Sequence, residues 1–409
     1  MEILNVLSLF DGMSCGQQAL ERSGIKYNKY YASEIDKYAI QVTQHNYPDT
    51  IQLGSVTEVD VTKLGYINLL IGGSPCQSFS FAGKRNGMTT TCNEEIYTLN
   101  RYLELKSDGF QFEGESYLFW EYMRILTDIR KYNPDVLFLL ENVEMGSKWE
   151  RVLSEAIGIF GVHINSALVS AQSRKRIYWT NIRTKEEGLF GELHSDIPQP
   201  EDRGILLKDI LEDEVDEKYY LSDAGLSGML KHQERHKSSG NGFGVQFISG
   251  ESEKSNTILQ RYYKDCKDNA VCIYQNPRGY NNGGFHASKS PTVGASSWEN
   301  NNLVIQLNPS KESGGVQPYQ QNRVYDINGI MPAVSAQLGR RNNILVPKAT
   351  ANISPRIRRL TPVECERLQT VEDNYSSCVS DTQRYKILGN GWTIDVIAHI
   401  FSFINNGET

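Results

Sequence analysis

Four short apolar runs, separated by sequence of helical type, constrain the fold of this chain most strongly. ILNVLSLF (3–10) leads into the glycine turn DGMSCG, and KYYASEID (29–36) ends in acidic residues. INLLIGG (67–73) and DVLFLLENV (135–143) have the composition of buried strands. Strands that alternate with helices predict βαβ units and a parallel sheet. The predicted fold class is therefore α/β for a first domain over residues 1–200.

The composition and the periodicity of the sequence change after the first domain. Between residues 220 and 350 Gly, Asn and Ser become frequent, and helical periodicity gives way to short β-like runs such as LVIQL and NILVP. This segment predicts a smaller, β-rich domain. Beyond residue 355, RRLTPVECERLQ and KILGNGWTIDVIAHIFSFI return to helical texture. We therefore expect residues 355–409 to complete the first domain.

Composition excludes several classes of protein. A hydrophobic content of 39% is ordinary for a globular chain, and no apolar stretch is long enough for a membrane span. The seven cysteines are scattered without a CxxC pair or a Cys/His cluster, which predicts reduced thiols, a cytoplasmic location and no bound metal. The net charge of −7 hides a polarised distribution, because an acidic stretch (210–220) precedes a mildly basic one (230–350).

The first turn has the form of a nucleotide-binding site. A strand, the turn FDGMSCG and a helix place backbone N–H groups at the carboxyl edge of a parallel sheet. Glu34 ends the second strand, where a carboxylate can accept hydrogen bonds from a ribose diol. The turn is not GxGxxG, so a dinucleotide is not specifically indicated. A tight turn followed by a solvated acid is the alternative.

Cys76 follows Gly-Gly-Ser-Pro at the end of the third run, in GGSPCQSFSFAGKRNG. A lone cysteine can serve in packing, as a metal ligand, as a redox group or as a nucleophile. Redox chemistry lacks a partner within a few residues, and metal binding lacks further ligands. Nucleophilic attack needs a thiolate and an electrophile. The position at the same sheet edge as the first turn favours this fourth role.

Further polar residues follow the later runs. Glu141 and Asn142 end DVLFLLENV, where desolvation in a ligand cavity would favour a protonated carboxyl group. Gln172, Arg174 and Arg176 stand at alternate positions, so in one extended strand they would share a face and form a site for an anion or a base carbonyl. A surface acid and a solvated edge strand are the alternatives.

Taken in order, these segments closely resemble the DNA (cytosine-5)-methyltransferases of bacterial or phage type. The resemblance is carried by LSLFDGMSCGQQAL, GGSPCQSFSFAGKRNG, LLENV, AQSRKRIYW, RRLTPVECERLQ and ILGNGWTIDVIAHI. It covers residues 3–185 and 355–402. It implies a Rossmann-like S-adenosylmethionine-dependent methyltransferase domain with a mostly parallel sheet. Residues 220–350 fall where the family carries its target recognition domain.

The resemblance implies a role for each catalytic candidate. Cys76 would add to carbon 6 of a cytosine flipped out of duplex DNA, which makes carbon 5 nucleophilic. Glu141 would hold N3 of the ring and supply a proton there. Arg174 would contact the cytosine carbonyl and orient the glutamate, with Arg176 in support. The product would be 5-methylcytosine at a specific short sequence.

The resemblance also implies S-adenosylmethionine as cofactor. The corresponding positions are Phe10, Asp11, Gly12, Ser14, Gly16, Glu34, Ile35, Ser55, Val56, Gly73, Asn390 and Thr393. Two positions depart from the family pattern. Ser55 stands where an aspartate usually meets adenine N6, so that contact weakens or passes to a backbone group. GNGWT replaces the commoner Gly-Asn-Ser-Val.

Double-stranded DNA is the implied partner, with contacts expected from Gln77, Ser78, Lys84, Arg85 and Gln172. The insertion over residues 89–115 makes the connection after Cys76 longer than usual. The resemblance is compatible with a monomer, with a separate restriction endonuclease as a companion. Two alternatives are an RNA cytosine methyltransferase with the same core and a catalytically silent DNA-binding relative. The long recognition segment disfavours the first, and the intact cysteine and glutamate disfavour the second.

Overall fold

A seven-stranded sheet forms the frame of the larger of two structural units. The computed structural model describes residues 4–75, 88–188, 191–220, 247–248, 254–257, 270–272 and 357–404. The first unit comprises Met1–Ile205, Thr257–Tyr263 and Cys365–Thr409. The second comprises Leu206–Asn256 and Lys264–Glu364.

The order of the strands in the central sheet is β3-β2-β1-β4-β7-β10-β8. The strands are β1 (Leu4–Leu9), β2 (Tyr27–Ser33), β3 (Ile51–Gln52), β4 (Leu69–Gly73), β7 (Leu137–Val143), β8 (Val162–Asn165) and β10 (Lys175–Thr180). All neighbouring pairs are parallel except those of β10, which runs antiparallel to β7 and to β8. The order reverses between β1 and β4, and ligands of open α/β sheets bind outside the carboxyl ends of the strands at such a switch point. The predicted mostly parallel α/β fold is confirmed.

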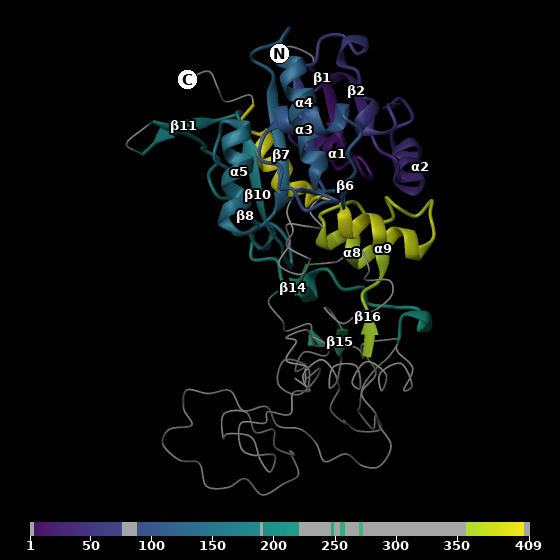
Figure 1. Ribbon diagram of the computed structural model, residues 1–409. Coiled ribbons are helices and arrows are strands. Elements are labelled where there is room, and N and C mark those ends of the chain that lie inside the picture. The colour runs from purple at the N-terminus through teal and green to yellow at the C-terminus, as the bar shows by residue number, and fades with distance from the viewer. Residues whose placement is uncertain are drawn as a thin grey trace, which may run out of the picture. The chain divides into compact units, whose positions relative to one another are not determined.

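Helices cover the sheet, and most of them connect successive strands (Figure 1). They are α1 (Cys15–Arg22), α2 (Lys37–Asn46), α3 (Leu99–Ser107), α4 (Phe119–Arg130), α5 (Ser147–Ile157), α8 (Pro362–Leu368), α9 (Asp381–Asn390) and α10 (Ile394–Phe401). The Asp36 side chain caps α2 by accepting from the N–H groups of Tyr38 and Ala39. Gly158 ends α5 in the left-handed conformation that glycine adopts without strain.

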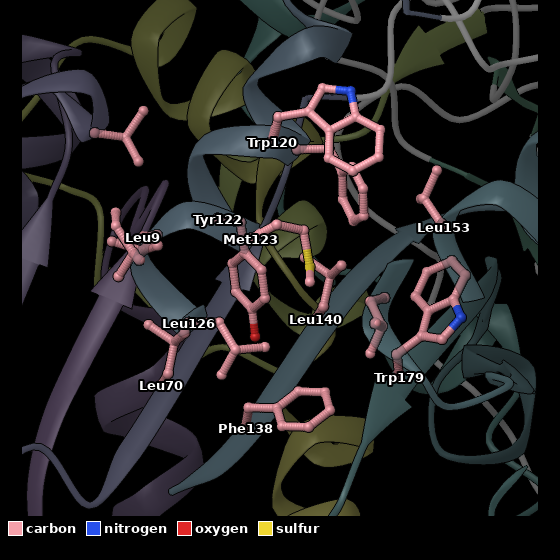
Figure 2. Close-up of a cluster of buried hydrophobic side chains, with 14 of the residues drawn as sticks. Leu9, Leu70, Trp120, Tyr122, Met123, Leu126, Phe138, Leu140, Leu153 and Trp179 are labelled. Atoms are coloured by element: carbon pink, nitrogen blue, oxygen red, sulfur yellow. The ribbon is translucent and has the colours of Figure 1, made fainter. Parts of the chain in front are cut away.

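Alternate residues of the central strands point to opposite faces of the sheet. On one face Leu9, Leu70, Phe138 and Leu140 pack with side chains of α4 and α5, including Trp120 (Figure 2). On the other face α1 lies so close to Ile71 that a Cβ added at Gly16 would sit 2.4 Å from its Cδ1. The two covered faces hold the carboxyl ends of the strands in fixed register.

The described residues also form several shorter strands and 3-10 helices. In the first unit these are β5 (Thr89–Thr90), β6 (Phe112–Glu113), β9 (Gln172–Ser173), β11 (Thr184–Glu187), β12 (Glu192–Ser195) and the 3-10 helices η1 (Val56–Glu58), η2 (Val61–Lys63), η3 (Ser116–Leu118) and η4 (Ser166–Leu168). The insertion 89–115 is thus an ordered part of the first unit, in which β5 and β6 pair antiparallel on either side of α3.

The second unit contains η5 (Leu207–Asp209), η6 (Glu217–Tyr219), β13 (Phe247–Ile248), β14 (Ser255–Asn256), β15 (Ala270–Cys272) and β16 (Ile357–Arg359). β13, β15 and β16 form a small mixed sheet. The buried Arg358 guanidinium pairs with Glu364 at 2.7 Å. Most of segment 220–350 lies outside the described residues, so a β-rich recognition domain there stays a prediction.

Candidate active site at the carboxyl edge of the sheet

The turn after β1 has an unusual backbone conformation. Phe10, Gly12 and Ser14 have φ values of 57°, 61° and 62°. Only glycine adopts this left-handed region without cost, so two of the three residues are strained. Strain of this kind persists where the surrounding structure enforces it, and it concentrates at ligand sites. A ligand-binding role for this turn stays a prediction.

Glu34 connects this turn with the start of α2. Its carboxylate accepts the Gly12 N–H at 2.8 Å, the Ile35 N–H at 2.7 Å and the Asp36 N–H at 2.8 Å. A carboxylate has about four acceptor positions. Three backbone donors fix Glu34 and leave capacity for a further donor from a ligand. Beside it the Ile35 side chain is 76% exposed, an unusual position for a large apolar group.

Asp11 lies beneath the same turn and is almost fully buried. Its Oδ1 accepts the Tyr30 hydroxyl at 2.8 Å, whereas Oδ2 has no hydrogen-bond partner among the described residues. Burial raises the pKa of this carboxyl group from 3.8 to about 6. The group therefore titrates close to neutral pH.

Ser55 and Val56 lie at the next position along the sheet edge. The segment is held against the end of β2 because the Ser33 hydroxyl donates to Gly54 O at 2.8 Å. The Ser55 hydroxyl lies 2.7 Å from the Thr57 hydroxyl and caps η1 through the Thr57 N–H. Its hydrogen-bonding capacity is thus partly used within the segment.

The catalytic candidates lie where β4 and β7 end. Gly73 is the register partner of Glu141. From the adjacent β10, Arg176 Nε lies 2.9 Å from Glu141 Oε1, and both side chains are largely buried. The ion pair holds the carboxylate in one orientation.

Trp392 closes this corner. A Cβ added at Gly73 would lie 2.7 Å from Trp392 Nε1 and 3.0 Å from Glu141 Oε2, so the indole and the carboxylate both contact the end of β4. From the sequence, this tryptophan is only a departure from the family pattern. The sequence did indicate that Trp392 has an unusual environment, because a large indole between a glycine and a threonine needs a wide space in the structure. Its neighbours could not be identified from sequence.

The strand that carries Gln172, Arg174 and Arg176 is not continuous, so a shared face for these three side chains stays a prediction. The strand is interrupted at Arg174, between β9 and β10. The Gln172 amide is buried and donates to Leu368 O at 3.1 Å. Arg174 donates to the carbonyl oxygens of Gly389 at 3.4 Å and Gly391 at 3.0 Å. Among the described contacts, Arg176 makes the ion pair with Glu141. The expected DNA contact of Gln172 stays a prediction that its burial does not favour.

The segment after α9 packs against the turn that follows β1. A Cβ at Gly391 would lie 3.1 Å from Met13 Cε and 3.4 Å from Cys15 Sγ. The Thr393 hydroxyl donates to the Gln369 side chain at 3.0 Å, and Asn390 is exposed. Residues from both ends of the chain therefore meet at the turn after β1.

Several predicted site residues lie outside the described part of the chain. These are Cys76, Gln77, Ser78, Lys84 and Arg85. Within the described residues no group of three or more His, Cys, Asp or Glu side chains is arranged to hold a metal ion. In the same residues no helix has the length and apolarity that a membrane span requires.

Comparisons with known proteins agree with this geometry. The family model described as C-5 cytosine-specific DNA methylase matches residues 4–108 and 105–406. An orphan methyltransferase of Bacillus phage SPR, M.SPRI, is 28% identical over 97% of this chain and 96% of its own length. The type II methyltransferase M.NlaX of Neisseria lactamica is 30% identical over 64% of this chain and 77% of its own length.

Solved structures show the same fold. The Entamoeba histolytica methyltransferase EhMeth superposes with a TM-score of 0.56 at 13% identity, over 100% of both chains. The S. pombe Dnmt2 methyltransferase has a TM-score of 0.56 at 15% identity, over 99% of both chains.

Proposed function

Because this chain belongs to the C-5 cytosine-specific DNA methylase family, we propose a mechanism in which Cys76 attacks the cytosine ring and Glu141 assists it. The general activity follows from the family: the chain is a DNA cytosine-5 methyltransferase that takes its methyl group from a donor of the S-adenosylmethionine type. The assignment of each step to a residue is the proposal.

One observation carries the assignment. Gly73 at the end of β4 pairs in register with Glu141 at the end of β7. Cys76 follows Gly73 by three residues, and three residues span at most about 11 Å. The chain therefore keeps the Cys76 backbone within reach of a ring that Glu141 contacts. No other described acid is both buried and paired with an arginine at the carboxyl ends of β4 and β7.

The steps follow from the chemistry of cytosine. The Cys76 thiolate adds to carbon 6 while Glu141 supplies a proton to N3, so the ring becomes an enamine whose carbon 5 is nucleophilic. Carbon 5 then takes the methyl group that S-adenosylmethionine supplies when bound, which leaves S-adenosylhomocysteine. A base removes the carbon 5 proton, the bond between carbon 6 and sulfur breaks to release the thiolate, and the N3 proton returns to Glu141. The cytosine must leave the DNA stack for these steps, which is base flipping.

Arg176 and Arg174 would act on Glu141 and on the base. The ion pair with Arg176 would hold the carboxylate in one orientation. Arg174, held by the carbonyl groups of Gly389 and Gly391, would be fixed for contact with the cytosine carbonyl. Pre-oriented groups lower the barrier because they need no reorganisation during the reaction.

The residues at the edge formed by β1, β2 and β3 fit the cofactor. Glu34 has acceptor capacity left for the ribose hydroxyl groups, and the exposed Ile35 side chain offers an apolar surface for adenine. The unpartnered Asp11 Oδ2 marks an acceptor near the turn expected to hold the methionine end. Phe10, Gly12, Ser14, Gly16, Ser55, Val56, Gly73, Asn390 and Thr393 are proposed to complete this pocket.

We assign DNA recognition to the remaining parts of the chain. Residues 220–350 are proposed as the target recognition domain, and Gln77, Ser78, Lys84 and Arg85 as contacts near the reacting base. Lysine and arginine beside a flipped base typically bind the phosphate backbone.

The test is transfer of labelled methyl groups from S-adenosylmethionine to duplex DNA and to RNA, followed by analysis of the nucleosides. We expect 5-methyldeoxycytidine from DNA, loss of activity in Cys76→Ala, and full activity in the matched control Cys92→Ala, which changes an exposed free thiol. Label found only in RNA would select the alternative substrate. An active Cys76→Ala enzyme would overturn the mechanism.

A further inference from the structure

The insertion 89–115 is packed into the first unit around one aromatic cluster. Tyr102 of α3 is buried, with its ring centroid 5.1 Å from that of Phe112 and 6.1 Å from that of Tyr117. Leu105, on the same helix, is fully buried in the main hydrophobic core. The insertion is therefore held rigidly against α4.

Glu121 of α4 is fully buried and receives three donors at this contact. Tyr102 donates its hydroxyl to Oε1 at 2.5 Å, and the Lys106 ammonium lies 2.5 Å from the same oxygen. Arg124 Nε donates to Oε2 at 2.8 Å. A buried carboxylate is costly unless such donors satisfy it. Burial and the neighbouring Glu121 raise the pKa of the Tyr102 hydroxyl, which keeps it protonated as a donor.

Arg124 connects this hydrogen-bond network to the 3-10 helix η1. Its Nη1 donates to Val59 O at 3.2 Å, and its Nη2 donates to both Val56 O and Val59 O at 3.2 Å. These carbonyl groups lie at the two ends of η1. The planar guanidinium fixes several donors in one geometry, so its position sets the position of the η1 backbone.

We propose that the insertion positions the adenine-binding wall of the cofactor pocket, through Tyr102 and Lys106 acting on Glu121 and Arg124. This inference rests on the proposed function, which places Ser55 and Val56 against adenine. The Ser55 hydroxyl is engaged with Thr57, so recognition at this wall falls to backbone groups. Their placement depends on Arg124. Tyr102, Lys106, Glu121 and Arg124 are positioning residues, because they act through the η1 backbone.

A second anchor of the insertion provides a matched control. Lys148 of α5 pairs with Glu95 at 2.7 Å and lies over the rings of Tyr97 and Trp149. This contact joins the insertion to α5 rather than to η1. Loss of the Lys148 ammonium therefore removes an ion pair of the insertion without touching the network at Glu121.

The test compares binding of S-adenosylhomocysteine and of its inosine counterpart, in which hypoxanthine replaces adenine. The variants are the double change Tyr102→Phe with Lys106→Met, the conservative change Lys106→Arg, and the control Lys148→Met. We expect the double variant to raise the Kd for S-adenosylhomocysteine on the order of tenfold, a change that corresponds to about 1.4 kcal/mol. The Kd for the inosine compound should rise less, so discrimination between the two falls. The kcat at saturating cofactor should stay within about twofold of the wild-type value, since the cost is in binding.

Lys106→Arg should retain wild-type binding, and so should Lys148→Met. An unchanged Kd ratio in a folded double variant would overturn the inference, as would an equal loss of binding in Lys148→Met. If the double variant melts below the assay temperature, the same two Kd values are measured with the single variant Tyr102→Phe. Ile35→Ala separates the two proposals. If it weakens S-adenosylhomocysteine binding and the double variant does not, only the inference fails. If the wild-type protein binds the two compounds equally well and Ile35→Ala changes the Kd of neither, the proposed cofactor pocket itself is wrong.

Discussion

Gly73 and Glu141 are register partners on neighbouring parallel strands, and a Cβ at Gly73 would lie 3.0 Å from Glu141 Oε2. The same Cβ would lie 2.7 Å from Trp392 Nε1. A side chain at this position would therefore force the carboxylate or the indole to shift. Such a shift would move the groups that the proposed chemistry needs.

Gly73→Ala should reduce methyl transfer on the order of tenfold to a hundredfold, because general acid–base groups work only in precise geometry. Steady-state kinetics with saturating cofactor measure the effect. Gly146→Ala is the matched control, because a Cβ there meets nothing within 4 Å and its φ of −65° suits any residue. Equal kinetics for the two variants would contradict the packing argument.

Glu141→Gln should lower kcat by about 10²–10⁴, the usual contribution of a positioned general acid or base. The cofactor should still bind, because Glu141 is not among the residues proposed to hold it. Arg176→Gln should lower kcat less, since it removes the orientation of the carboxylate and leaves the carboxyl group itself. Isothermal titration with S-adenosylhomocysteine and single-turnover transfer separate binding from chemistry. Near-normal turnover in Glu141→Gln would count against its proton role.

The stability of the cofactor-free protein should depend on pH through Asp11. Its pKa rises from 3.8 in the unfolded chain to about 6 in the folded state, so the folded state binds this proton more tightly. The contribution of Asp11 to the free energy of unfolding is therefore largest below pH 3.8 and is lost as pH rises to about 6. At one pKa unit per 1.36 kcal/mol, the change is on the order of 3 kcal/mol.

Asp11→Asn removes this titration. Relative to wild type, the variant should therefore gain stability as pH rises from 4 toward 7, and the difference should level off above the folded-state pKa. Thermal unfolding at a series of pH values, without cofactor, gives the difference curve directly. A difference that does not vary with pH would show that Asp11 does not titrate in this range.

Ile35→Ala should weaken binding of S-adenosylhomocysteine about fivefold to thirtyfold, because one buried apolar side chain against a ligand is worth about 1–2 kcal/mol. The melting temperature of the free protein should hardly change, since the side chain is 76% exposed. Ile51→Ala, which changes another exposed isoleucine, should leave binding unaltered. Weaker binding in both variants would indicate a general effect of the substitution.

The sequence predicted the sheet well because its strands are continuous apolar runs with glycine or acid at their ends. Glu34 and Glu141 could be placed at one edge because the carboxyl ends of parallel strands meet there. The contacts between distant segments could not be predicted in the same way. Trp392 meets Gly73 across more than 300 residues, and no local pattern encodes that distance.

The arginine strand shows a second limit. A period of two predicts one face for Gln172, Arg174 and Arg176 only if the strand is continuous. The interruption at Arg174 depends on the tertiary hydrogen bonds of that residue, its N–H to Asn165 and its carbonyl oxygen to the Ser166 N–H. The insertion is a third case. Tyr102 of its helix donates to the buried Glu121, and this contact could not be predicted from either segment alone.

Covalent capture tests the central claim most directly. Base-resolution mapping of methylated DNA from a host that expresses the chain first identifies the target sequence. A duplex carrying 5-fluorocytosine at that target is then incubated with the protein and S-adenosylmethionine, and the mixture is denatured. Fluorine at carbon 5 cannot leave as a proton does, so the bond between Cys76 and carbon 6 should persist. We predict a denaturation-resistant adduct with the wild-type protein and none with Cys76→Ala. An adduct of equal yield with Cys76→Ala would contradict the account.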